Sequence, residues 1–132
     1  MARAPEPQVV HLDTHVVCWL YEGRPELLSP AARQAVEGAE VFVSLIVDLE
    51  LQLLREIGRI RSGPETVLAA LSTDIGLRVA ASDLLRIVAQ ARSLGWTRDP
   101  FDRLIVADAM LSGARLVTKD TLVRKHSAVA LW

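Results

Sequence analysis

The chain has 132 residues, of which 51% are hydrophobic and 23% charged, and its formal net charge is −1. This composition fits one folded domain and argues against extensive disorder. It also excludes the strongly basic surface that many nucleic-acid-binding proteins carry. If the ligand is RNA, we expect the attraction to come from a local patch and from bound metal.

Strands and helices are predicted to alternate along the chain, from hydrophobic periodicity and from helix start and stop signals. Ser29 followed by Pro30 is a typical helix start, and Ser82 is expected to cap another helix. In chain order, the prediction is strand 9–13, helix 14–23, helix 30–37, strand 40–47, helix 48–60, helix 64–72, strand 76–81, helix 82–95, helix 100–113, strand 115–120, helix 121–126 and strand 128–132.

The predicted fold class is α/β. The first two strands are apolar nearly throughout, which is typical of a parallel sheet covered on both faces. The alternation therefore predicts a three-layer α/β/α sandwich around a four- to five-stranded parallel sheet. We expect a flexible tail over residues 1–8 and a single domain over residues 9–132.

The N-terminal segment MARAPEPQ has no apolar core, so no secretory signal is expected. No apolar run approaches the roughly 20 residues that cross a bilayer, so we expect no membrane association. The one cysteine, Cys18, excludes an intramolecular disulfide and lies in an apolar run that favours a buried small side chain. A cytoplasmic protein is the expectation.

Four acidic residues are predicted to meet at one edge of the sheet. Asp13 ends the first strand and Asp120 the fourth. Glu50 is expected in the first turn after the second strand, and Asp102 in the first turn of the helix that leads into the fourth. These positions share the carboxyl edge, where open parallel sheets bind ligands.

Clustered carboxylates repel one another unless a cation neutralises them. Mg²⁺ and Mn²⁺ prefer such oxygen ligands, and a carboxylate-held Mg²⁺ suits the cleavage of phosphodiesters. Single acids at helix starts are more often caps, and that interpretation is preferred for Asp48, Asp83 and Asp99.

Three segments resemble the PIN-domain family, especially its VapC-type toxins. They are LDTHVVCWL (12–20), VSLIVDLELQLLREIGRI (43–60) and DPFDRLIVADAMLSGARLVTKD (99–120), and the last is the most specific. The resemblance extends from about Val9 to Trp132. It places the family's metal-site acids on Asp13, Glu50, Asp102 and Asp120.

The resemblance implies a PIN-like sandwich and an Mg²⁺- or Mn²⁺-dependent endoribonuclease that cleaves RNA. It further implies the toxin of a type II toxin–antitoxin pair, a VapB-like antitoxin whose tail covers the acidic edge, and a homodimer. Two positions depart from the pattern. Thr97 stands where many relatives have His, and Asp108 stands where relatives often have Gln and is expected to be structural or solvated.

Several other residues are candidates for supporting the site or contacting substrate. Thr14 and Thr118 are expected either to bind a phosphate or orient an acid, or simply to pack at strand ends. Arg103 is a candidate for an RNA phosphate or a neighbouring carboxylate, and Ser44 for support of the site, although a plain strand residue is favoured. The basic group Arg55, Arg59 and Arg61 is a further candidate for RNA phosphates, although a solvated helix end is favoured. An apolar stripe of Leu51, Leu54 and Ile57, with Trp19 if it is exposed, is a candidate surface for an antitoxin or a second protomer, although core packing is favoured for most of it.

Two alternatives stay open. One is a housekeeping PIN-domain nuclease in RNA processing, with the same chemistry and no antitoxin. The other is a degenerate PIN-like binding module, which the presence of all four acids disfavours. A receiver domain and a haloacid-dehalogenase-type phosphatase are excluded, because the former needs an early acidic pair and the latter a D-x-D motif, where this chain has Asp13-Thr14-His15.

Overall fold

A computed structural model describes residues 8–132, so the tail predicted over residues 1–8 lies outside the described residues except for Gln8. The strands are β1 (Val9–Leu12), β2 (Glu40–Val43), β3 (Arg78–Val79), β4 (Arg115–Val117) and β5 (Ala130–Leu131). The helices are α1 (Thr14–Tyr21), the 3-10 helix η1 (Pro25–Leu27), α2 (Pro30–Gly38), α3 (Leu45–Glu56), α4 (Pro64–Ile75), α5 (Leu84–Ala91), α6 (Pro100–Leu111) and α7 (Thr121–His126).

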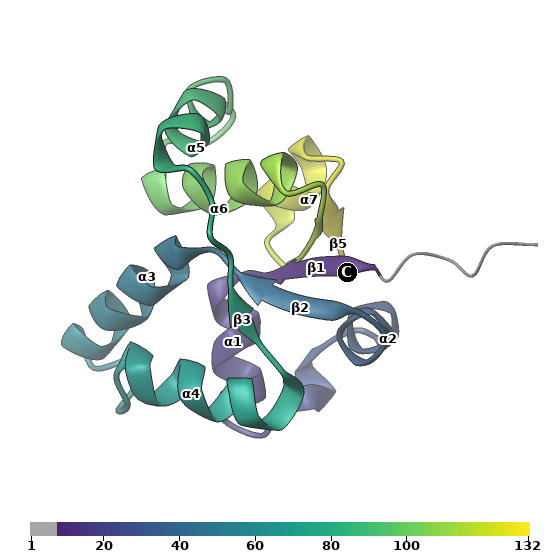
Figure 1. Cartoon of the computed structure of the whole chain (residues 1–132), viewed down its shortest axis with the longest axis vertical. Coiled ribbons are helices and arrows are strands. Elements are labelled where there is room, and N and C mark those ends of the chain that lie inside the picture. The colour runs from purple at the N-terminus through teal and green to yellow at the C-terminus, as the bar shows by residue number, and fades with distance from the viewer. Residues whose placement is uncertain (1–7) are drawn as a thin grey trace, which may run out of the picture.

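The five strands form one sheet in the order β3-β2-β1-β4-β5, and every pairing is parallel. Helices α1, α2 and α4 lie on one side of the sheet, and α5, α6 and α7 lie on the other (Figure 1). The predicted three-layer α/β/α sandwich is thereby confirmed. Within residues 8–132, no helix is both long and apolar enough to cross a membrane.

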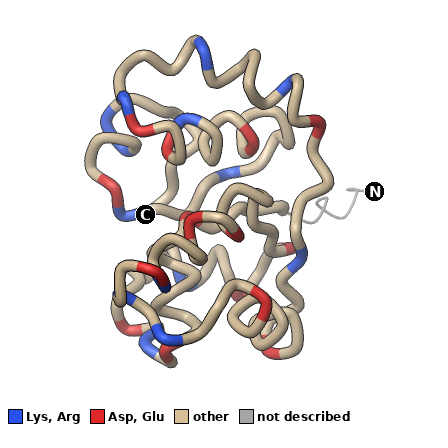
Figure 2. Tube along the Cα trace, turned by 90° about the vertical axis from the view of Figure 1, so that its left-hand side faces the viewer, with Lys and Arg blue, Asp and Glu red and all other residues tan. Residues whose placement is uncertain are grey.

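The core lies on both faces of the central strands. Leu12, Val43 and Leu116 of the strands are fully buried. Leu51 of α3 is also fully buried, and Ile105 of α6 is 1% exposed. The aliphatic side chains of the helices therefore pack against the sheet and bury it. Lys and Arg are spread among Asp and Glu along the trace, and neither sign covers a whole side (Figure 2).

The second strand is shorter than predicted. We expected a strand over 40–47, but β2 ends at Val43 and α3 begins at Leu45. Ser44 is the N-cap of α3, and its Oγ accepts a hydrogen bond from the Ile46 amide at 3.3 Å. The expectation that Ser44 is a plain strand residue is therefore wrong. The apolar run continues across the boundary because Val47 and Leu51, one helical turn apart, both face the core.

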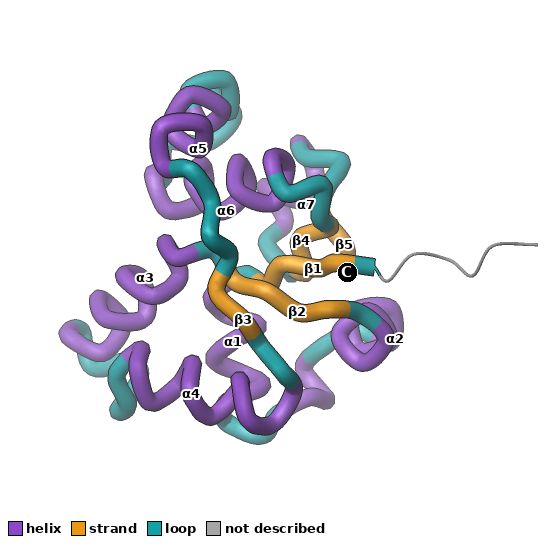
Figure 3. Tube along the Cα trace, in the orientation of Figure 1, coloured by secondary structure: helices purple, strands orange, loops and turns teal. Residues whose placement is uncertain are grey.

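The later strands are also shorter than the predicted ranges 76–81, 115–120 and 128–132. Gly76 ends α4 at φ +70°, a left-handed conformation that suits glycine. After β3, a loop carries the chain across to α5 on the other side of the sheet (Figure 3). The N-cap of α5 is Asp83 rather than Ser82, whose hydroxyl instead donates to the buried Asp108. Asp108 is thus structural and not solvated.

Candidate active site

Two of the four candidate acids follow neighbouring strands at the centre of the sheet. Asp13 follows β1 and is the N-cap of α1, and Asp120 lies three residues after β4 and is the N-cap of α7. The helices after these two strands lie on opposite sides of the sheet (Figure 1). This is the topological switch point, where open α/β sheets form a crevice for ligands.

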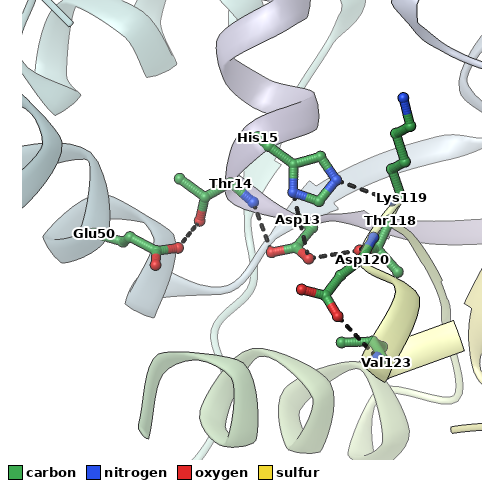
Figure 4. A network of polar contacts seen from close by, with 8 residues as sticks. All are labelled: Asp13, Thr14, His15, Glu50, Thr118, Lys119, Asp120 and Val123. Carbon is green, nitrogen blue, oxygen red and sulfur yellow. Dashed lines mark hydrogen bonds and ion pairs between the residues drawn. The ribbon is translucent and has the colours of Figure 1, made fainter. Parts of the chain in front are cut away.

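Hydrogen bonds hold the Asp13 carboxylate in one orientation (Figure 4). Its Oδ1 accepts from the Thr14 amide at 2.9 Å, and its Oδ2 accepts from the Thr118 hydroxyl at 2.7 Å. The same Thr118 oxygen accepts from the Asp120 amide at 3.1 Å. Thr118 therefore joins the two strand-end acids, and of its two expected roles the structure shows orientation of an acid.

Glu50 reaches the site from α3. Glu50 was expected in the first turn after the second strand. Because α3 begins at Leu45, it lies in the second helical turn instead. Its carboxylate accepts a hydrogen bond from the Thr14 hydroxyl, so α1 and α3 are joined beside Asp13 (Figure 4). Burial raises the pKa of Glu50, the Thr14 hydrogen bond opposes that rise, and the charges of Asp13 and Asp99 add to it.

Asp102 lies in the first turn of α6, as predicted. Asp99 is the N-cap of this helix and accepts from the Phe101 amide at 2.8 Å, and Pro100 occupies the first helical position. The cap interpretation of Asp99 is therefore confirmed. Burial, and with it the charges of the neighbouring carboxylates of Asp99, Asp13, Asp120 and Glu50, raises the pKa of Asp102 from 3.8 to about 7.

All four candidate acids line one cleft of about 340 Å³. Among residues 8–132, no Lys or Arg forms an ion pair with any of them within 4.0 Å. His15 lies nearest to a carboxylate, with Nδ1 3.7 Å from Asp13 Oδ2. The cleft therefore gathers four carboxylates, none of which has a Lys or Arg ion-pair partner within 4.0 Å among residues 8–132.

The donor set of the cleft fits a hard divalent cation. It consists of carboxylate oxygens, and the raised pKa of Asp102 records how unfavourable a full set of charges is there without a counter-ion. Within residues 8–132, no three of the His, Cys, Asp and Glu side chains are already close enough to hold an ion together. A cation there would be held by fewer than three of these side chains, with waters completing its coordination, unless side chains move.

Other predicted residues lie beside the cleft or outside it. Ser44 does not line it, but it begins the helix that carries Glu50. Arg103 is also outside, and its Nε donates to the Thr97 carbonyl at 2.8 Å rather than to a carboxylate. Arg59 lines the cleft, whereas Arg55 lies against the backbone at Gly63.

Sequence reasoning missed His15, Glu22 and Ile60 as residues of the cleft, and it considered Trp19 only as a contact for an antitoxin or a second protomer. His15 Nε2 accepts a hydrogen bond from the Lys119 amide at 2.9 Å. The His15 ring lies edge-on to the Trp19 ring, with 5.1 Å between the ring centroids. Burial lowers the pKa of His15, although the charges of Asp13 and Asp120 oppose this. The spacing of four residues on a helix was the available signal for a shared face. Cys18 is half-buried and lines the cleft, so it is not the fully buried side chain expected.

Comparisons with known proteins agree with this geometry. The family model described as PIN domain matches residues 10–128. Ribonuclease VapC22 of Mycobacterium tuberculosis (strain ATCC 25618 / H37Rv) is 38% identical over 120 residues, which cover 89% of this chain and 91% of that protein.

Two solved structures share the fold. One is the structure of VapBC2 from Rickettsia felis bound to a DNA fragment from their promoter, with a TM-score of 0.64, 17% identity and coverage of 91% of this chain and 94% of that one. The other is a toxin–antitoxin complex from Klebsiella pneumoniae, with a TM-score of 0.67, 23% identity and coverage of 93% and 96%.

Proposed function

The chain belongs to the PIN domain family, and from that premise we propose that it is a metal-dependent endoribonuclease, the toxin of a type II toxin–antitoxin pair. The observation that carries the proposal is the cleft itself, in which Asp13, Glu50, Asp102 and Asp120 converge without a Lys or Arg partner among residues 8–132. The name of the 38% identical relative, a ribonuclease, supports the RNA substrate.

Asp13 and Asp120 are proposed to hold Mg²⁺ or Mn²⁺ most directly. Asp13 is fixed by two hydrogen bonds, and one Asp120 oxygen is fixed by the Val123 amide at 2.9 Å, which leaves the other free. Asp102 on α6 and Glu50 on α3 would complete the set. When bound, the cation would activate a water and neutralise charge on the phosphodiester.

The residues of the chain prepare the cleft for that cation. Thr118 and the Thr14 amide hold the Asp13 carboxylate still, and the Thr14 hydroxyl does the same for Glu50. Because the pKa of Asp102 is raised to about 7, a cation bound beside this carboxyl would displace its proton. The RNA phosphates meet a less negative surface only after that exchange.

A cleavage assay on total cellular RNA tests the chemistry. We expect cutting in Mg²⁺ or Mn²⁺ and none in chelator, and we expect Asp102→Asn to be inactive. Asp48→Asn is the matched control, because Asp48 lies on α3 two residues before Glu50 and does not line the cleft. Cleavage that persists in chelator would refute the metal-dependent mechanism.

Growth separates the toxin from the housekeeping nuclease. Expression of a toxin should arrest growth, Asp13→Asn should abolish the arrest, and co-expression of a small VapB-like antitoxin should suppress it. Unaffected growth with an active wild-type nuclease would favour the housekeeping role. An inactive protein that still binds RNA would instead indicate the degenerate binding module. The cytoplasmic location and the single domain over residues 9–132 stay predictions.

A homodimer is proposed from an exposed apolar face. The predicted stripe of Leu51, Leu54 and Ile57 is divided, because Leu51 is fully buried and Ile57 is 68% exposed. The outward side chains are Leu45, Leu49, Leu53 and Ile57 on α3, and Leu84, Leu85 and Val88 on α5. A second copy of the chain could cover both helices. Sedimentation of wild type against a Leu49→Glu, Leu85→Glu double variant tests this, with a dimer expected to become a monomer.

A further inference from the structure

The wall of the cleft that α1 contributes is aromatic. Trp19 is half-buried and lines the cleft together with all four candidate acids. Apart from the His15 imidazole, its ring is the one aromatic group among the described residues that line the cleft. Trp19 also packs against the hydrophobic core. The proposed chemistry needs only the carboxylates, so the part of the ring that lines the cleft is available to another part of the substrate.

The Trp19 ring is held from several sides. The His15 ring lies edge-on to it at 5.1 Å, and the Trp132 ring is tilted against it at 6.1 Å. His15 is itself fixed, because its Nε2 accepts the Lys119 amide at 2.9 Å. A ring that is already immobile loses little conformational freedom when a flat ligand stacks on it.

A cation stands next to the same ring. Lys119 is exposed, and its Nζ lies over the Trp19 ring at 5.9 Å from the centroid. Its neighbour in sequence, Asp120, is one of the four acids, so Lys119 follows the same strand end from which the cleft is built. Sites that bind single-stranded nucleic acid combine these elements, with a cation for the backbone and an aromatic side chain for a base.

We propose that Trp19 is the stacking platform for one unpaired RNA nucleobase adjacent to the cleaved phosphodiester, with Lys119 contacting the phosphate of that nucleotide. This inference rests on the proposed ribonuclease function. It adds a base-binding position to the acidic cleft, and it explains how a protein of net charge −1 holds RNA without a basic surface. Stacking depends little on base identity, so the position selects unpaired nucleotides rather than one sequence.

Trp19 fluorescence gives a direct signal of stacking that does not depend on cleavage. The sequence has three tryptophans, so Trp96→Phe and Trp132→Phe leave Trp19 as the only one. Asp102→Asn in the same protein prevents cleavage and removes one negative charge from the cleft. With Mg²⁺ present, a short single-stranded oligouridylate should quench the emission. An oligonucleotide of the same length made of abasic ribose phosphates should bind without quenching.

Cleavage kinetics locate the base. A preferred single-stranded cleavage site, mapped in total RNA, is remade as a set of oligonucleotides in which one nucleotide at a time lacks its base. One position next to the cut should lower kcat/KM about 5- to 100-fold with wild type. For Trp19→Leu, kcat/KM on intact RNA should fall by the same factor, and removal of that base should cause no further fall in kcat/KM. Trp19→Phe should restore most of the activity.

Trp96→Leu is the matched control, because Trp96 stacks on His126 and does not line the cleft. The base-binding position is refuted if RNA is cut but does not quench Trp19. It is also refuted if, at every position, the fold-losses in kcat/KM from Trp19→Leu and from removal of the base multiply, because the two changes would then act independently. Quenching without cleavage by the Asp102-containing protein would instead refute the nuclease function and leave the stacking platform standing. Absence of both would refute both.

Discussion

The buried hydroxyl of Thr118 donates a hydrogen bond of 2.7 Å to Oδ2 of Asp13, across 105 positions of sequence. Thr118 is fully buried and Asp13 is 6% exposed, so water competes little for this bond. This one contact fixes the carboxylate at the centre of the candidate site to the strand that precedes Asp120.

Thr118→Val tests that contact by removing the hydroxyl while keeping the shape of the side chain. It leaves a buried Asp13 oxygen and the Asp120 amide without their partner, so we expect a loss of about 1–3 kcal/mol in the free energy of unfolding. RNA cleavage should fall about 10- to 100-fold, because the two acids lose their alignment. Thr118→Ser keeps the hydroxyl and should retain most activity. Equal losses in both variants would contradict a role for the hydroxyl.

Asp102→Asn should stabilise the metal-free protein at alkaline pH. The pKa of Asp102 rises from 3.8 to about 7 on folding. The folded protein therefore binds the proton more tightly than the unfolded chain, and stability is lost as pH rises through about 7. Asn removes the charge, and we expect a gain of about 1–2 kcal/mol at pH near 8, less than the full shift because solvent screens part of it.

Urea unfolding of both proteins without metal at pH near 5 and near 8 measures this gain. The difference between wild type and Asp102→Asn should shrink at the lower pH, where Asp102 carries less charge. Mg²⁺ should stabilise the wild type more at the higher pH, since protons compete with the cation. A stability difference that does not depend on pH would contradict charge repulsion as its cause.

His11 should make the protein sensitive to acid. It is 1% exposed on β1, and its Nδ1 has no hydrogen-bond partner. Burial lowers its pKa below 6.5, and the charge of Asp108 opposes this only in part. The unfolded chain therefore binds more protons than the folded one below pH 6.5, and stability from this group is lost as pH falls through that value.

His11→Leu removes the titrating group, so its stability relative to wild type should improve as pH falls below 6.5. Thermal unfolding across a pH series gives the stability of each protein as a function of pH. The difference between the two curves removes the contributions of His15 and the carboxylates, which both proteins share. His126→Gln is the control, because His126 is exposed on α7. Parallel curves for wild type and His11→Leu would show that His11 does not contribute to acid sensitivity.

Ser44→Ala tests the start of α3. Loss of the cap should cost about 1 kcal/mol, and cleavage should fall because α3 carries Glu50. Ser29→Ala is a matched variant, since Ser29 caps α2 through the Ala32 amide at 3.0 Å and lies away from the cleft. It should cost similar stability and leave cleavage unchanged. No stability loss in Ser44→Ala would mean that packing alone sets the start of α3.

The fold was predictable where local and global signals agree. Asp99 and Pro100 correctly predict the start of α6, and this start places Asp102 in the first turn of the helix. The boundary between β2 and α3 was not predictable from hydrophobicity, because Val43 and Val47 are equally buried on either side of Ser44. A cap within an apolar run leaves little mark on the pattern, so Glu50 was placed one turn too early.

The missing parts of the site depend on contacts between distant segments. His15 meets the Lys119 amide 104 positions later, and nothing in the local sequence of either residue indicates that pairing. Asp13 and Asp120 could be predicted to converge, because parallel strands share an edge. The individual hydrogen bonds between them could not be predicted, because they depend on side-chain packing at the end of β4.

Because β1 pairs with β4 at the centre of the sheet, the cleft closes late during synthesis. A nascent chain that has emerged only as far as α5 has Asp13 and Glu50 but neither Asp102 nor Asp120, and the partner strand of β1 is missing. The topology therefore leaves the candidate site incomplete until nearly all of residues 9–120 are free to fold.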